Sequence, residues 1–211
     1  MSSASPTSST QSTSARGRYR TIDLVTIASL GVAFGVVFWA WGKLYGVIDL
    51  ATVVGYPPAG GLLAGPWLIA GVVGGLIVRK AGAAFATELT AAVVSMFVLG
   101  GTEWGFTVFF SGVVQGLGAE LVLLAFAYRR WTLPVAVLAG ALAGVFGAVY
   151  EALFYYSDWD LGYQLVYGVL FALSGAVVAG GLGWALVRSL ATTGALDAFG
   201  PGREVHDATS G

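Results

Sequence analysis

The chain has 211 residues, of which 57% are hydrophobic and only 10% are charged, and its formal net charge is −1. A soluble domain typically has roughly 25% charged residues, so a water-soluble globule is excluded. The absence of cysteine excludes disulfide frameworks and thiolate metal sites, and the one histidine, His206, lies near the carboxyl terminus. The composition predicts an all-α integral membrane protein with no histidine-based catalytic or metal site in its apolar body.

The chain begins with a polar segment. Residues 1–15 are mainly serine and threonine, and Arg16, Arg18 and Arg20 follow them. Such a segment cannot bury enough apolar surface to fold, so we predict a disordered cytoplasmic tail over residues 1–20. A secretory signal would have a short apolar segment with a cleavage site, whereas here the apolar run is long and continues into the protein.

Six apolar stretches follow, each long enough to cross a hydrocarbon core of roughly 30 Å. Their ranges are 22–44, 60–79, 82–100, 105–128, 133–156 and 161–190. The stretch 46–56 is too short to span and is predicted to form a re-entrant or interfacial piece. We therefore predict one six-helix membrane bundle over residues 21–195, followed by a second disordered cytoplasmic tail over residues 196–211.

The basic residues predict the orientation of these spans. With the amino terminus inside, nine of the ten lysines and arginines are cytoplasmic, and only Lys43 is outside. The pairs Arg79-Lys80 and Arg129-Arg130 then lie in short cytoplasmic connections, as the positive-inside rule requires. This distribution predicts that the amino and carboxyl termini are both cytoplasmic.

Three acidic residues, Glu88, Glu120 and Glu151, lie inside the predicted spans, where lysine and arginine occur only at the ends and none lies within the membrane to pair with them. An ionisable group within the membrane is expensive and is a functional candidate by default. At a rise of about 1.5 Å per residue, Glu88 and Glu120 have matching depths and Glu151 lies in the outer third. For Glu88 and Glu120 two interpretations stay open, a hydrogen bond between helices or a contact with a ligand. The position of Glu151 favours a ligand.

Aromatic residues gather in the outer half of the predicted bundle, where a belt at the membrane interface explains only some of them. They are Phe38, Trp39, Trp41, Tyr45, Tyr56, Trp67, Trp104, Phe106, Phe109, Phe110, Tyr150, Phe154, Tyr155, Tyr156, Trp159, Tyr163 and Tyr167. Aromatic walls beside carboxylates suit a flat ligand that is cationic or donates hydrogen bonds. Trp67, Tyr150, Tyr155 and Tyr163 are the aromatic residues that we expect to contribute to such a site.

Several segments resemble a known family. The run Arg79–Ala84, followed by Glu88 and by the stretch Gly112–Glu120, is similar to the YkoE-type substrate-binding (S) components of energy-coupling-factor (ECF) transporters. The resemblance covers about residues 20–195, and Gln-Gly-Leu-Gly-Ala-Glu at 115–120 is its most specific part. It implies that the ligand is thiamin or its hydroxymethylpyrimidine precursor.

The resemblance also implies roles for particular residues and partners. By motif match, the residues expected to bind the ligand are Trp67, Glu88, Gln115, Glu120 and Glu151. Ala28, Gly31 and Gly35 resemble the surface with which S components dock onto a coupling subunit. Transport would need this transmembrane coupling subunit and ABC ATPase subunits in a prokaryotic cell membrane. No phosphate-binding loop occurs in the chain, so it is expected to be a non-catalytic subunit. We also expect it to have no cofactor, no metal ion and no nucleic-acid partner.

Three alternatives remain at this point. A proton- or cation-coupled secondary transporter could use the three glutamates as a relay, although no internal repeat supports it. A cobalt-uptake S component is a second alternative, which the lack of histidine and cysteine in the body disfavours. The third is a scaffold protein in which the glutamates only bond between helices.

Overall fold

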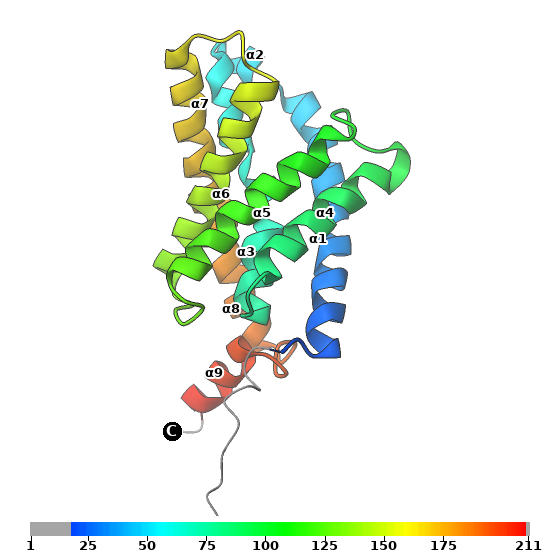
Figure 1. Ribbon diagram of the computed structural model, residues 1–211, viewed down its shortest axis with the longest axis vertical. Coiled ribbons are helices and arrows are strands. Elements are labelled where there is room, and N and C mark those ends of the chain that lie inside the picture. Colours follow the sequence, from blue (N-terminus) through cyan, green and yellow to red (C-terminus); the bar gives the residue numbers. More distant parts are fainter. Residues whose placement is uncertain (1–17, 210–211) are drawn as a thin grey trace, which may run out of the picture.

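The computed structural model describes residues 18–209, in which helices and turns occur without a strand (Figure 1). In chain order the elements are α1 (Thr21–Ile48), α2 (Leu50–Val54), η2 (Pro57–Leu63), η3 (Gly65–Leu68), α3 (Ile69–Val78), α4 (Ala83–Phe97), η4 (Val98–Gly100), α5 (Thr107–Ala125), α6 (Leu133–Phe154), α7 (Leu161–Ser174), η5 (Gly175–Leu182), α8 (Gly183–Thr192) and α9 (Gly200–Thr209). The prediction of an all-helical protein is confirmed for these residues. Residues 1–17 of the predicted amino-terminal tail lie outside the described residues.

The long apolar helices make this a multi-pass membrane protein. Within residues 18–209, four helical runs are long and apolar enough to cross a membrane, namely Thr21–Val54, Thr107–Ala125, Leu133–Phe154 and Leu161–Thr192. The pair Pro57–Leu63 and Gly65–Val78, bent by 46°, would be a fifth span, and α4 is apolar but has only 15 residues. All six predicted ranges coincide with helical segments, while the count of six spans and the orientation stay predictions.

Helix α3 lies inside the bundle, and the other long helices surround it (Figure 1). Every residue from Ala70 to Val78 is buried, because α3 contacts α1, α4, α5, α6 and α8. Around it, α1 packs on α4, α4 on α5, and α5 on α6. The core therefore consists of aliphatic and small side chains that permit close helix contact.

Two glycines of α1 pack inside the bundle. A Cβ atom at Gly31 would lie 2.4 Å from Thr90 Cγ2, and one at Gly35 would lie 2.6 Å from Val94 Cβ, both on α4. Ala28 is exposed instead. Gly31 and Gly35 are therefore covered by α4 of the same chain, which the spacing of small residues did not reveal, and docking of a partner at Ala28 stays a prediction.

A side chain of α7 holds the broken helix before α3 in place. Ser174 Oγ accepts a hydrogen bond from the backbone N–H of Gly65 at 2.9 Å and donates one to the carbonyl of Leu62 at 2.6 Å. A Cβ atom at Gly65 would lie 2.6 Å from the carbonyl oxygen of Ser174, so only glycine permits this approach. The contact fixes the segment that carries Trp67.

The carboxyl-terminal segment packs against one end of the bundle rather than forming the predicted disordered tail. Helix α9 covers Gly200–Thr209, and Leu196 and Phe199 before it are buried. Arg79 forms an ion pair with Glu204, and its Nη2 donates to Glu204 Oε2 at 3.0 Å. The prediction for residues 196–209 is corrected because these partners lie more than a hundred residues apart in sequence, where a local pattern carries no information on them.

Candidate functional site

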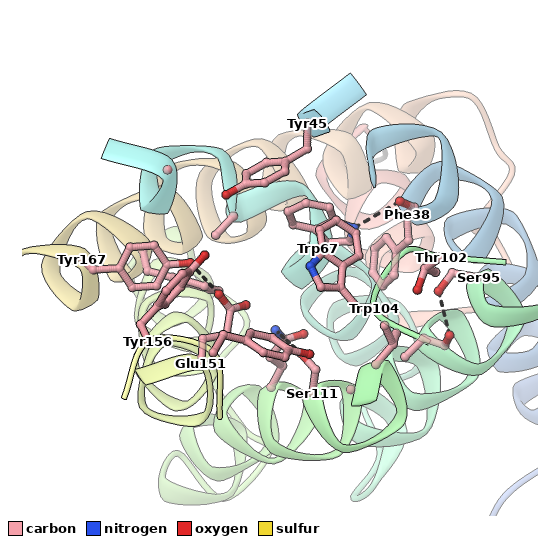
Figure 2. A pocket seen from close by; sticks show the side chains of 18 residues that line it. Phe38, Tyr45, Trp67, Ser95, Thr102, Trp104, Ser111, Glu151, Tyr156 and Tyr167 are labelled. Carbon is pink, nitrogen blue, oxygen red and sulfur yellow. Dashed lines mark hydrogen bonds between the residues drawn. The ribbon is translucent and has the colours of Figure 1, made fainter. Parts of the chain in front are cut away.

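A cavity of about 80 Å³ lies toward the end of the bundle away from α9, with room for several water molecules. Its walls come from α1, the bent segment η2–η3, α4, the loop before α5, α5, α6 and α7. They consist of Phe38, Tyr45, Gly60, Ala64, Trp67, Ala92, Ser95, Thr102, Trp104, Val108, Ser111, Gly112, Gln115, Glu151, Tyr155, Tyr156, Tyr167 and Phe171. Figure 2 shows these side chains converging on one space.

Glu151 is the single charged side chain among the residues that line the cavity. Its Oε2 accepts a hydrogen bond from the hydroxyl of Tyr167 at 2.5 Å, and Tyr156 lies beside the pair in Figure 2. No lysine or arginine lines the cavity beside this carboxyl group.

Three aromatic rings form one wall of the cavity. The ring of Trp67 lies 5.4 Å from that of Trp104 and 5.3 Å from that of Tyr45, and all three pairs meet edge to face. Trp67 is fixed because its Nε1–H donates to the carbonyl of Phe38 at 3.1 Å. Such rings offer their faces to flat or cationic groups.

The rest of the cavity carries neutral polar groups. Gln115 Nε2 donates to Ser111 Oγ at 2.8 Å, one helical turn away on α5. A Cβ atom at Gly147 would lie 3.1 Å from Gln115 Nε2, so this glycine leaves room for the amide. The hydroxyls of Ser95 and Thr102 lie at the end away from Glu151 (Figure 2).

The structure brings four of the eight predicted ligand-binding residues into the cavity, namely Trp67, Gln115, Glu151 and Tyr155. Tyr150 lies nearby, but its hydroxyl donates to the carbonyl of Thr107 at 3.0 Å. Tyr163 is 37% exposed, and its ring packs on Tyr56 with 5.5 Å between centroids. Neither of these two tyrosines lines the cavity.

Glu88 and Glu120, the other two predicted residues, lie outside the cavity and cap the starts of helices. Glu88 Oε2 accepts from the backbone N–H of Gly71 at 2.6 Å, in the first turn of α3. Glu120 accepts from the N–H groups of Gly82 at 2.6 Å and Phe85 at 3.1 Å, at the start of α4. The first N–H groups of a helix lack partners within the helix and attract negative charge. Of the two interpretations left open, this geometry supports hydrogen bonding between helices.

Glu120 has a third partner beyond the helix start. The hydroxyl of Tyr128 donates to Glu120 Oε1 at 2.6 Å. Burial and the neighbouring carboxylate raise the pKa of Tyr128 well above its usual range, so the phenol keeps the proton that it donates. The carboxylate of Glu120 is thus occupied by donors of its own chain.

Sequence reasoning missed several residues of the site and one buried acid. The aromatic residues Tyr45, Trp104, Tyr156 and Tyr167 belonged to the predicted outer group, but nothing in their spacing marked them as cavity residues. The i, i+4 spacing of Ser111 and Gln115 could have indicated a polar face of α5. Asp23 was also overlooked: it is buried at the start of α1 and pairs with Arg20 at 2.9 Å and Lys80 at 2.5 Å.

Comparisons with known proteins agree on one family. A family model for the permease component of ABC-type cobalt transport systems matches residues 22–146. A relative from Bacillus subtilis (strain 168), the proposed HMP/thiamine permease protein YkoE, is 34% identical over 185 residues, which cover 87% of this chain and 90% of the relative. A crystal structure of an S component of an ECF transporter superposes with a TM-score of 0.84 at 34% identity, over 92% of this chain and 96% of that chain.

Proposed function

Because this chain belongs to the YkoE-type S components of ECF transporters, in the family of ABC-type cobalt transport permeases, we propose that it captures thiamin or its hydroxymethylpyrimidine precursor (HMP). In this proposal the amino terminus is cytoplasmic, the cavity opens toward the outer side of the cell membrane, and Glu151 faces the cationic ring of thiamin.

The observation that carries this proposal is the combination of Glu151 with an aromatic wall in a cavity whose lining includes no lysine or arginine. Thiamin has a permanent thiazolium cation and a flat aminopyrimidine. A carboxylate without a basic partner stabilises a cation, and the faces of Trp67 and Trp104 attract it further. HMP shares only the neutral ring and would use the walls without the charge.

Cobalt is the second candidate, since the matching family model describes cobalt transport. Within residues 18–209, no group of three or more His, Cys, Asp or Glu side chains is placed to hold a metal ion. A protein site for a transition-metal ion is built from several His, Cys or carboxylate ligands, and the walls of the cavity supply one carboxylate among aromatic rings. The donor set therefore favours a heterocyclic vitamin.

In this proposal the chain is a non-catalytic subunit. Transport would need a transmembrane coupling subunit as its partner, while separate ABC ATPase subunits hydrolyse ATP. The sequence supports this division, because it has no phosphate-binding loop.

The test is calorimetry on the purified chain in detergent with thiamin, HMP, Co²⁺ and ATP. We expect binding of thiamin and HMP and none of ATP. A ligand at 100 times its Kd should also stabilise the fold by about 2.7 kcal/mol. Binding of Co²⁺ alone would reverse the choice between the two candidates, and uptake into liposomes by this chain without ATP would favour a secondary transporter.

A further inference from the structure

The cavity has two polar ends. The positive charge of the proposed ligand accounts for the end at Glu151 but not for the other one. Figure 2 places Thr102 and Ser95 at one end and Glu151 with Tyr156 and Tyr167 at the other, and Trp67 and Trp104 lie between them. All of these residues line the cavity.

The hydroxyl of Thr102 lacks a partner. Thr102 Oγ1 is buried and makes no hydrogen bond in the structure. Buried side-chain oxygens in folded proteins almost always have a partner, so this hydroxyl is available to a molecule inside the cavity. A hydroxyl can both donate and accept.

The hydroxyl of Ser95 complements the hydroxyl of Thr102, because it can accept a hydrogen bond from the same molecule. Its Oγ donates to the carbonyl of Ala92 at 2.7 Å, so its proton is engaged and its lone pairs remain to accept. The two hydroxyls together offer one donor, from Thr102, and one acceptor, from Ser95.

The backbone holds Thr102 at this place. Gly100, Gly101 and Gly105 have positive φ angles of 92°, 81° and 55°, a region that side chains with a Cβ rarely adopt. A Cβ atom at Gly101 would also lie 2.6 Å from the carbonyl oxygen of Met96. This glycine-dependent turn places Thr102 and Trp104 of one short loop on the same cavity.

Charge restricts what this end can bind. Glu151 is the one charged residue on the described walls, and it lies at the other end. The acid that follows Thr102 in sequence, Glu103, is exposed and pairs with Lys43 at 3.6 Å. The group that meets Thr102 and Ser95 is therefore neutral.

We propose that Thr102 and Ser95 form a second subsite, which hydrogen-bonds the donor–acceptor edge of a neutral heterocycle such as an aminopyrimidine. The amino group donates to Ser95 Oγ, and Thr102 Oγ1 donates to the adjacent ring nitrogen. The proposal rests on the proposed function, in which the cationic ring faces Glu151, and it makes these two hydroxyls specificity-determining.

The experiment compares thiamin, HMP and the 4-oxo analogue of thiamin, in which a carbonyl replaces the amino group, by calorimetry. Thr102→Val should weaken the binding of thiamin and of HMP by about threefold to tenfold, the effect of one neutral hydrogen bond, and Ser95→Ala should do the same. The native chain should prefer thiamin to the oxo analogue by about tenfold, and this preference should fall to about twofold or less in Ser95→Ala, which removes the acceptor for the amino group.

Two further variants serve as controls. Thr102→Ser keeps the hydroxyl and should keep the affinities for thiamin and HMP, which separates the hydrogen bond from folding. Thr90→Val removes a hydroxyl of α4 that donates to the carbonyl of Ala86 at 2.7 Å and does not line the cavity, and it should leave all three affinities unchanged.

The outcomes separate the two proposals. If the native chain binds thiamin and HMP but Thr102→Val leaves both affinities unchanged, or Ser95→Ala leaves the preference for the amino compound unchanged, the subsite is wrong and the proposed function stands. A loss confined to thiamin would also overturn the subsite, since HMP carries the same aminopyrimidine. If the native chain binds none of the three compounds, the proposed function itself fails.

Discussion

At the scale of single residues, the position of each carboxylate decides its role. Glu151 has one donor, Tyr167, and faces the cavity. Glu120 has three donors of its own chain and lies away from the cavity. Of the three glutamates inside the predicted spans, Glu151 is the one that lines the cavity, so it is the one placed to meet a cation there.

Replacing Glu151 with glutamine should separate the two ligands. Glu151→Gln keeps the shape and removes the charge, and a charged hydrogen bond is worth about 1.5–3 kcal/mol. We expect the affinity for thiamin to fall by roughly one to two orders of magnitude and that for HMP to fall less. Calorimetry with both ligands measures the difference, and equal losses would assign Glu151 a structural role.

At the scale of helices, contacts between neighbours hold the cavity walls in position. Glu88 and Glu120 cap α3 and α4, and small residues let α1 approach α4. These contacts stabilise the bundle, and Glu88, Glu120, Gly31 and Gly35 do not line the cavity, so stability and affinity should respond separately to substitutions there.

Removing the cap of α4 should destabilise the fold but not the site. Glu120→Ala leaves the N–H groups of Gly82 and Phe85 without their acceptor, which costs about 1–3 kcal/mol when such groups are buried. We expect a lower thermal unfolding midpoint in detergent and a Kd for thiamin within about twofold of the native value. A large loss of affinity for thiamin at unchanged stability would show that Glu120 binds the ligand.

A matched pair of substitutions tests the packing of α1. Gly31→Leu would drive a side chain into Thr90, and overpacking typically costs about 1–3 kcal/mol. Ala28→Leu, on the exposed face of the same helix, should leave stability unchanged. Thermal unfolding of the isolated chain measures both, and equal stability of the two variants would place Gly31 on a free surface.

At the scale of the whole molecule, the two ends of the bundle differ in chemistry. One end holds the aromatic cavity, and the other carries buried Asp23 with Lys80, Arg79 with Glu204, and α9 (Figure 1). Arg79 also lies over the ring of Trp131 at 5.3 Å. Charged groups therefore hold the start of α1 and helix α9 to the bundle at the end that the positive-inside rule predicts to be cytoplasmic.

The docking of α9 should weaken in acid. The hydrogen bond from Arg79 lowers the pKa of Glu204 below its ordinary value of 4.5, and Arg188 and Arg203 add to this. A lowered pKa in the folded state stabilises the fold above pH 4.5, and this contribution is lost as the pH falls through the folded value. Because Glu204 is half exposed, the effect is modest.

Hydrogen exchange of the α9 amides, corrected for intrinsic rates, measures this effect. Protection should decrease below about pH 4.5 in the native chain. Glu204→Gln should show the weaker protection at neutral pH already and little further change across the same range. An identical acid response in both chains would show that another group controls the docking.

The sequence alone determined the class of the protein and the ranges of its main helices. Apolar content and segment length are local properties, and a bilayer accepts few other solutions for segments of this kind. It also marked Trp67, Glu151 and Tyr155 as candidates, because a carboxylate without a basic partner and an excess of aromatic residues are visible in the residue order, whereas Gln115 was a candidate only through the family resemblance.

Only the tertiary structure decided how these residues are used. Glu88, Glu120 and Glu151 look alike in sequence, yet two cap helix starts and one faces the cavity, since each role depends on a helix or a loop elsewhere in the chain. Gly31 faces α4, and α9 docks through Glu204, for the same reason. Thr102 lines the cavity because the loop between η4 and α5 forms part of its wall. Hydrogen-bond partners and helix faces are set by contacts between distant segments, and hydrophobic periodicity does not encode them.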